Sequence, residues 1–163
     1  MDKLLLNKTV DAVVDEYIRP SKNMTLAAAN RLISKVLEKA KEMNVKAVVA
    51  VTDRGANPVS IQCTDGSYIA SYDIALNKAY TSVALKMRTK ELAELAKPGA
   101  SLYGIQFTNG GKIVIFGGGE PLKSKSGEIV GGLGVSGGSE KEDTYLAEYG
   151  RNIFEKGLKQ NGY

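Results

Sequence analysis

FGGGEPL at residues 116–122 and GGLGVSGG at residues 131–138 are the stretches that decide the fold of this chain. Twelve of its eighteen glycines fall between Gly104 and Gly138. Glycine costs backbone entropy in regular structure, so this density indicates tight turns or another group lying close to the backbone. Gly132, Gly134 and Gly137 also spell G-x-G-x-x-G, the fingerprint of a dinucleotide-binding loop.

The rest of a dinucleotide site is missing from the sequence. Such a site needs a parallel neighbouring strand and an acidic residue about 20 positions further on. A strand before the glycines and a helix after them are predicted, but too few residues follow that helix for another strand. A phosphate-binding Walker loop is excluded because no Gly-Lys-Ser/Thr follows at the required spacing. The fingerprint is therefore a coincidence of spelling in an antiparallel meander.

Alternating glycines leave one face of the strand at 129–135 without side chains. Two explanations stay open: the bare face serves sheet curvature and helix packing, or it forms a ligand pocket. Residues 136–139 then open a helix, where free N–H groups and the helix dipole favour anions.

Apolar periodicity predicts the remaining elements. We expect helices at 25–43, 71–88 and 90–96 and a last helix capped near Ser139, and strands at 46–52, 59–64, 103–107, 112–116 and 129–135. Asn109-Gly110 favours a tight hairpin turn between the third and fourth strands. The strand at 46–52 is predicted to be buried on both faces. Tyr72 and Tyr145 are predicted to face inward, and Cys63 is interpreted as a buried structural thiol.

The first 21 residues predict a separate amphipathic helix and linker. Apolar residues from Leu6 to Ile18 follow spacings of three and four, and Arg19-Pro20-Ser21 ends the helix. We expect residues 1–21 to pack on their own domain or on a partner subunit, or to dock onto another protein. Residues 22–163 are predicted to form a single domain.

Composition narrows the function. The chain has 163 residues, a net charge of +4 and no histidine, which excludes Ser–His and Cys–His triads and zinc fingers. We expect a cytoplasmic protein that binds neither membrane nor nucleic acid, because no apolar run could span a bilayer and no basic run carries interleaved aromatics. The pair Glu140/Asp143 is interpreted as part of a solvated helix surface, whereas Lys78 and Thr81, one helical turn apart, are candidate ligand-binding residues.

Several motifs together resemble one family. They are VTDRG at 51–55, KAYTS at 78–82, Pro98-Gly99, TNGG at 108–111, the two glycine runs, and Glu142-Asp143. In this order they resemble the GlcG/HbpS family, which also supplies the C-terminal domain of the PduO corrinoid adenosyltransferase, and the resemblance covers roughly residues 24–158. It implies an α/β (α+β) fold of the profilin/PAS type. In that fold helices pack on a five-stranded antiparallel sheet, and the N-terminal helix is an addition.

The resemblance also implies a function. Members form homo-oligomers, and some bind heme or another tetrapyrrole; others occur in catabolic or bacterial microcompartment systems. The chain departs from a heme-binding pattern in lacking a histidine for the iron. We expect a non-catalytic small-molecule-binding module rather than an enzyme, with Lys78, Thr81, Gly118, Gly119, Gly134 and Ser136 at its site. The alternative is an accessory or assembly protein that docks to a shell or enzyme partner through residues 1–21.

Overall fold

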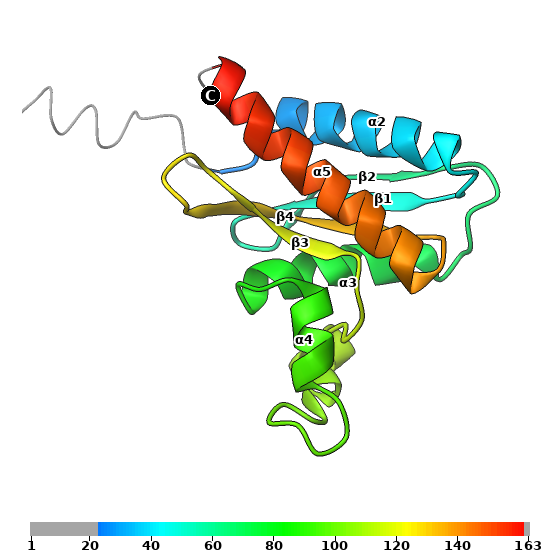
Figure 1. Cartoon of the computed structure of the whole chain (residues 1–163), viewed down its shortest axis with the longest axis vertical. Helices are drawn as coiled ribbons and strands as arrows, with labels where there is room; N and C mark the ends of the chain where they lie inside the picture. Colours follow the sequence, from blue (N-terminus) through cyan, green and yellow to red (C-terminus); the bar gives the residue numbers. More distant parts are fainter. Residues whose placement is uncertain (1–22, 162–163) are drawn as a thin grey trace, which may run out of the picture.

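The computed structural model describes residues 23–161, which form a four-stranded antiparallel sheet with helices on both faces (Figure 1). The strands are β1 (Val48–Asp53), β2 (Pro58–Cys63), β3 (Gly119–Lys123) and β4 (Ile129–Ser136). The helices are α2 (Leu26–Glu42), α3 (Ser71–Ala84), α4 (Thr89–Leu95) and α5 (Glu140–Asn161), with two 3₁₀ turns, η1 (Ile105–Phe107) and η2 (Asn109–Gly111). The α+β class is confirmed, and the sheet has four strands instead of the expected five.

The strand order is β2-β1-β4-β3, and every neighbouring pair is antiparallel. The central strand β1 is buried from Val48 to Thr52, as its continuous apolar sequence predicts. Because β4 runs antiparallel to both of its neighbours, its glycines do not belong to a βαβ unit. The Rossmann interpretation is therefore excluded, as the sequence indicated.

Helices α2 and α5 cover one face of the sheet (Figure 1). Thr25 caps α2 by accepting a hydrogen bond from the amide of Ala28 at 3.2 Å, and Asn44 follows the helix with a left-handed φ of 57°. Side chains of α2 and α5 and the alternate residues of β1 and β4 share the main core, which includes Ile33, Val51 and Leu146. The sequence predicted this helix and both of its ends.

Helix α3 covers the opposite face and lies directly on the glycines of β4. A Cβ at Gly134 would stand 1.9 Å from the carbonyl oxygen of Ala75, and one at Gly132 would stand 2.4 Å from that of Ala79. Ala75 and Ala79 are fully buried. The bare face of β4 is therefore occupied by the backbone of α3, which agrees with the packing explanation of these glycines.

The predicted hairpin at 103–116 is wrong. Residues 105–111 form two 3₁₀ turns, with local bonds such as the amide of Phe107 to the carbonyl of Gly104 at 3.0 Å. Asn109 and Gly110 do adopt the positive φ expected of a turn, at 51° and 65°. Tyr103 and Phe107 are exposed, because no strand lies opposite them and local bonds replace a ladder. The edge strand is instead β3, which overlaps the glycine run at 116–122 and was not among the predicted strands.

Three predictions of burial are also wrong. Tyr72 and Tyr145 are about half exposed, at 46% and 49%. Cys63, at the end of edge strand β2, is exposed as well. It pairs with Val48, on the face that α3 covers, but α3 lies mainly over β4, β1 and β3 and covers the edge strand β2 little. The alternation of apolar and polar residues predicted correctly which face of β2 carries Cys63. It did not show how much of that face α3 covers.

Residues 89–116, here called the arm, project from the body below α3 (Figure 1). Its base is fixed by ion pairs around Glu120, whose side chain is 2% exposed. Arg88 donates to one carboxylate oxygen at 3.0 Å and Arg151 to the other at 2.9 Å, and Arg88 also bonds Glu148. Burial raises the pKa of Glu120, and the two arginines oppose that rise.

The predicted helix and linker at 1–21 lie outside the described residues, so that prediction stays open. No helix within residues 23–161 combines the length and apolar character needed to cross a membrane.

Candidate functional site

The candidate site is a cavity of about 330 Å³ at the N-terminus of α5, here called the α5 cavity. It is lined by Tyr68, Ala70, Ser71, Ile74, Phe116, Ser136, Gly137, Gly138, Glu140 and Asp143. Its volume lies at the lower end of the range for small-molecule pockets. Three distant segments meet here: the start of α3, the end of the arm, and the β4–α5 connection.

The β4–α5 connection is fixed by its own polar groups. The amide of Ser139 donates to Glu142 at 2.7 Å while the Ser139 hydroxyl accepts from the amide of Glu142 at 3.4 Å, a reciprocal capping box. The amide of Gly138 donates to Asp143 at 2.9 Å. The carboxylates of Glu142 and Asp143 therefore already accept from the backbone amides that were expected to bind an anion.

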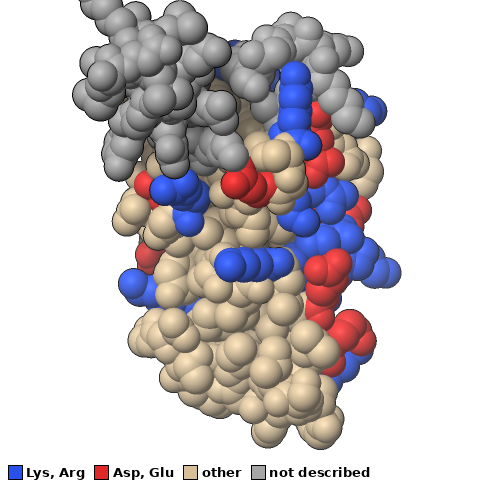
Figure 2. All heavy atoms as spheres, turned by 90° about the vertical axis from the view of Figure 1, so that its left-hand side faces the viewer, with Lys and Arg blue, Asp and Glu red and all other residues tan. Residues whose placement is uncertain are grey.

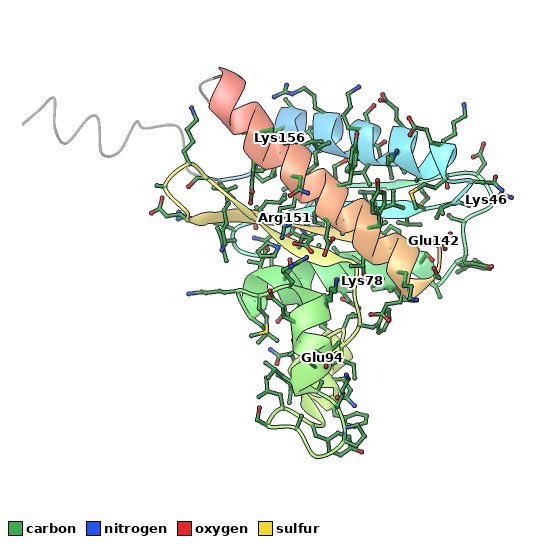
Figure 3. The ribbon with its side chains drawn as sticks, viewed as in Figure 1. Lys46, Lys78, Glu94, Glu142, Arg151 and Lys156 are labelled. Atoms are coloured by element: carbon green, nitrogen blue, oxygen red, sulfur yellow. The ribbon has the colours of Figure 1, made fainter. Side chains whose placement is uncertain are left out.

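A buried ion pair lies behind the cavity wall. The ammonium of Lys78 donates to Asp143 Oδ2 and to the carbonyl oxygen of Val135, both at 2.8 Å. The side chains of Lys78 and Asp143 are 0% and 5% exposed. Lys78 thus reaches from α3 to the first turns of α5 (Figure 3). It joins the helices on the two faces of the sheet beside the last residues of β4.

Burial dominates the electrostatics of this pair. It lowers the pKa of Lys78 and raises the pKa of Asp143, in each case against the attraction of the opposite charge. The ring centroid of Phe116 lies 4.9 Å from the Lys78 nitrogen, a cation–π distance. Two of the groups around the nitrogen, Asp143 and Phe116, line the cavity, so the Lys78–Asp143 pair lies directly behind its wall.

The structure brings some of the predicted site residues together. Ser136 lines the cavity and donates to Ser71 at 3.1 Å. Gly118 lies against the lysine: a Cβ there would stand 2.8 Å from Lys78 Nζ, and its φ is 110°. Ser136 therefore lines the α5 cavity, whereas Lys78 and Gly118 lie behind its wall. Whether they bind a ligand stays a prediction.

The other predicted residues serve packing. Gly134 lies under the backbone of α3, and a Cβ at its strand partner Gly119 would stand 2.6 Å from the Lys78 carbonyl oxygen. The hydroxyl of Thr81 accepts from the amide of Val114 at 3.0 Å and thereby holds the chain leading into β3. None of these three lines the α5 cavity.

The carboxylates of the cavity were not among the predicted site residues. Asp143 is buried, so the interpretation of Glu140/Asp143 as a solvated surface is wrong for Asp143. A signal was available: Asp143 precedes Leu146 and Ala147 by three and four residues, on the buried stripe of α5. Lys78 similarly follows Ala75 by three residues. A lysine and an aspartate on two buried stripes indicate a buried pair.

Other parts of the molecule offer weaker candidates. A groove of about 460 Å³ lies between α2 and β2, but it contains none of the predicted site residues. Within residues 23–161, no three His, Cys, Asp or Glu side chains gather in a way that could hold a metal ion.

The comparisons with known proteins agree with the resemblance in the sequence. A family model described as "Haem degrading protein HbpS-like" matches residues 24–152. An uncharacterized 15.0 kDa protein from the dhaT-dhaS intergenic region of Citrobacter freundii is 45% identical over 133 residues, covering 82% of this chain and 93% of the relative.

Two further matches involve PduO. The corrinoid adenosyltransferase PduO of Citrobacter freundii is 33% identical over 152 residues, which are 87% of this chain and 45% of PduO. The chain thus spans less than half the length of that relative. The crystal structure of a PduOC:heme complex superposes with a TM-score of 0.76 at 33% identity, covering 80% of this chain and 94% of the other.

Proposed function

The chain belongs to the HbpS-like family, and from this premise we propose that it is a small-molecule-binding module whose ligand occupies the α5 cavity. The observation that carries the proposal is the composition of the cavity wall. Apolar and aromatic side chains, Tyr68, Ile74 and Phe116, lie beside the hydroxyls of Ser71 and Ser136. A mainly apolar cavity with a few convergent polar groups is the usual form of a ligand site.

Heme or another tetrapyrrole is the ligand that membership of the family suggests. Tyrosine holds heme iron in some proteins, and Tyr68 is the cavity residue that could do so in the absence of histidine. The cavity is too small to enclose a porphyrin, so the ring would extend over the exposed side chains at the mouth, which include Ile69 at 97% exposure. Glu140 and Asp143 would turn the propionates toward solvent.

A second copy of the chain would cover such a ligand. Tyr68 and Ile69 at the cavity mouth, and Tyr103 and Phe107 on the arm, are large apolar side chains left exposed. A broad area with few charged side chains covers the lower part of the molecule in Figure 2, where the arm lies. We therefore include homo-oligomerisation in the proposal, because exposed apolar patches of this kind mark interaction sites.

A hemin titration of the full chain tests this function. We expect a saturable change in the Soret band, and an altered spectrum for Tyr68→Phe because the phenol oxygen is lost. Tyr145→Phe is the matched control, since it removes an exposed phenol that lies outside the cavity lining and the arm, and should behave as the parent protein. Absence of a saturable Soret change would reject heme as the ligand.

The sequence supports one alternative function. The family model begins at residue 24, so the amphipathic stripe between Leu6 and Ile18 lies outside the matched range. The alternative is an accessory protein that uses residues 1–21 to dock onto a microcompartment shell or an enzyme. A fluorescent reporter fused to residues 1–21 should concentrate at the shell in cells that make one, and diffuse fluorescence would count against this alternative.

A further inference from the structure

We propose that the α5 cavity captures small, neutral aldehydes or ketones as a reversible imine on Nζ of Lys78. This inference rests on the proposed function in one respect, that the α5 cavity is a ligand site. It adds the chemical class of a small ligand and the atom to which that ligand becomes attached.

Lys78 Nζ lies directly behind the wall of the α5 cavity. Lys78 Nζ lies 2.8 Å from Asp143 Oδ2 and 4.9 Å from the centroid of Phe116, and both of these residues line the cavity. The nitrogen is therefore separated from the cavity by the Phe116 ring and the aspartate. Phe116 is 41% exposed and precedes Gly117 and Gly118, so its ring is the movable part of this wall.

The glycine at 118 keeps space beside the nitrogen. A Cβ at Gly118 would stand 2.8 Å from Lys78 Nζ, which is closer than normal contact. The same residue has a φ of 110°, which side chains rarely permit. The absence of a side chain at Gly118 therefore leaves room for the Lys78 ammonium group, while the Gly118 carbonyl is held by the amide of Val135 at 2.9 Å.

The reactivity of Lys78 depends on its protonation. An amine attacks a carbonyl only in its neutral form, and lysines become nucleophilic when burial lowers their pKa. Burial lowers the pKa of Lys78 and raises that of Asp143, while the charges of Asp143 and Glu140 act to retain the proton on Lys78. Asp143 is thus placed to exchange a proton with Lys78 over 2.8 Å.

The chemistry balances without an oxidant or reductant. The lone pair of neutral Nζ forms a bond to the carbonyl carbon, and the carbonyl oxygen takes a proton from the Asp143 carboxyl group. The attacking nitrogen then returns a proton to the Asp143 carboxylate. Loss of water from the carbinolamine forms the C=N bond, so amine and carbonyl compound give imine and water, and hydrolysis reverses the reaction.

The cavity selects by charge and size. Glu140 and Asp143 are its charged lining residues, and the lining set contains no lysine or arginine. A keto acid would bring a carboxylate beside these two, whereas a neutral aldehyde meets no repulsion. Tyr68 and Ile74 offer apolar surface to a short alkyl chain, and a volume of about 330 Å³ restricts the site to small molecules.

Reductive trapping of the full chain tests the inference. Protein is mixed with one equivalent of propanal and sodium cyanoborohydride, and the propyl adducts are located by peptide mass spectrometry. We expect Lys78 to be labelled before exposed lysines such as Lys35 and Lys97, and the labelling to saturate. Pyruvate under the same conditions should leave Lys78 unlabelled.

Variants sharpen the result. Asp143→Asn should shift the pH profile of Lys78 labelling to lower pH, because loss of the carboxylate charge lowers the pKa of Lys78, whereas Lys97→Arg should leave that profile unchanged. If Asp143→Asn does not fold, the labelling order in the parent protein still decides the matter. Surface lysines labelled while Lys78 stays unmodified would overturn the inference, and equal labelling by pyruvate would overturn its charge selection. Hemin binding is measured separately, so either proposal can fail while the other stands.

Discussion

Replacing Asp143 by asparagine should destabilise the protein strongly and in a pH-dependent way. Asparagine keeps an oxygen that can accept from the amide of Gly138, so the variant removes mainly the charge opposite Lys78. The lysine side chain is 0% exposed, so bulk solvent does not solvate its nitrogen in place of the lost carboxylate. Removing one member of a buried pair costs about 3–5 kcal/mol. In a chain of this size that lowers the melting temperature by about 6–20 °C.

The pH dependence follows from the pKa of Lys78. Burial lowers it below its ordinary value of 10.5, so the unfolded chain binds the proton more tightly. Stability therefore rises with pH between the folded pKa and 10.5. Loss of the Asp143 charge lowers the pKa of Lys78 in the folded protein further. The pH range over which stability rises with pH becomes wider as a result. The destabilisation by Asp143→Asn should accordingly be larger at about pH 7 than at about pH 9.

Urea unfolding followed by circular dichroism at both pH values provides the assay. Glu94→Gln removes an exposed carboxylate that pairs with Lys97 on the surface, and this control should change stability little at either pH. Lys78→Met combined with Asp143→Asn removes both charges and should recover at least half of the lost stability. A loss that does not depend on pH, or a double variant as unstable as the single one, would refute the role assigned to this pair.

Gly134→Ala should destabilise the fold by about 1–3 kcal/mol in urea unfolding, because its Cβ would meet the Ala75 carbonyl oxygen at 1.9 Å. Gly157→Ala, where a Cβ would meet no atom within 4 Å, is its helical control and should stabilise by about 0.5–1 kcal/mol; equal effects would contradict the packing account. Glu120→Gln should increase amide hydrogen exchange in α4 because it weakens the contacts of Arg88, and unchanged exchange would show that the arm is held by other contacts. Phe107→Ser should reduce the mass of any oligomer in sedimentation experiments, whereas an unchanged mass would exclude the arm from the interface.

Much of the fold follows from local sequence patterns. Helix α2 begins and ends where Thr25 and Asn44 indicated, and β1 is buried on both faces as its apolar run predicted. These features depend on neighbours in the sequence, and caps and periodicity encode them directly. The glycines of β4 likewise indicated a close approach, and α3 supplies it.

The errors arise where distant segments decide the structure. Alternation at 103–107 is typical of a strand, but no opposing strand lies beside it, so Phe107 stays exposed. Strand β3 contains Pro121 and two charged residues and lacks alternation, yet it pairs with β4 because Gly119 fits beneath α3. Single-sequence patterns do not report such tertiary contacts.

The candidate site shows the same division. Lys78 and Ser136 could be singled out from their motifs, whereas Asp143 was assigned to the surface because acidic residues are usually solvated. Its burial depends on Lys78, which is 65 residues away in the sequence. The pair forms only because α3 and α5 approach each other beside the last residues of β4. The same approach places the pair behind the wall of the α5 cavity.

Hydrogen–deuterium exchange of the full chain with and without hemin tests most directly whether the α5 cavity is the ligand site. We expect protection at residues 68–74, 116–118 and 136–143, which line or adjoin the cavity. Protection confined to the groove between α2 and β2, which is lined by residues from Ser34 to Thr64, would contradict it.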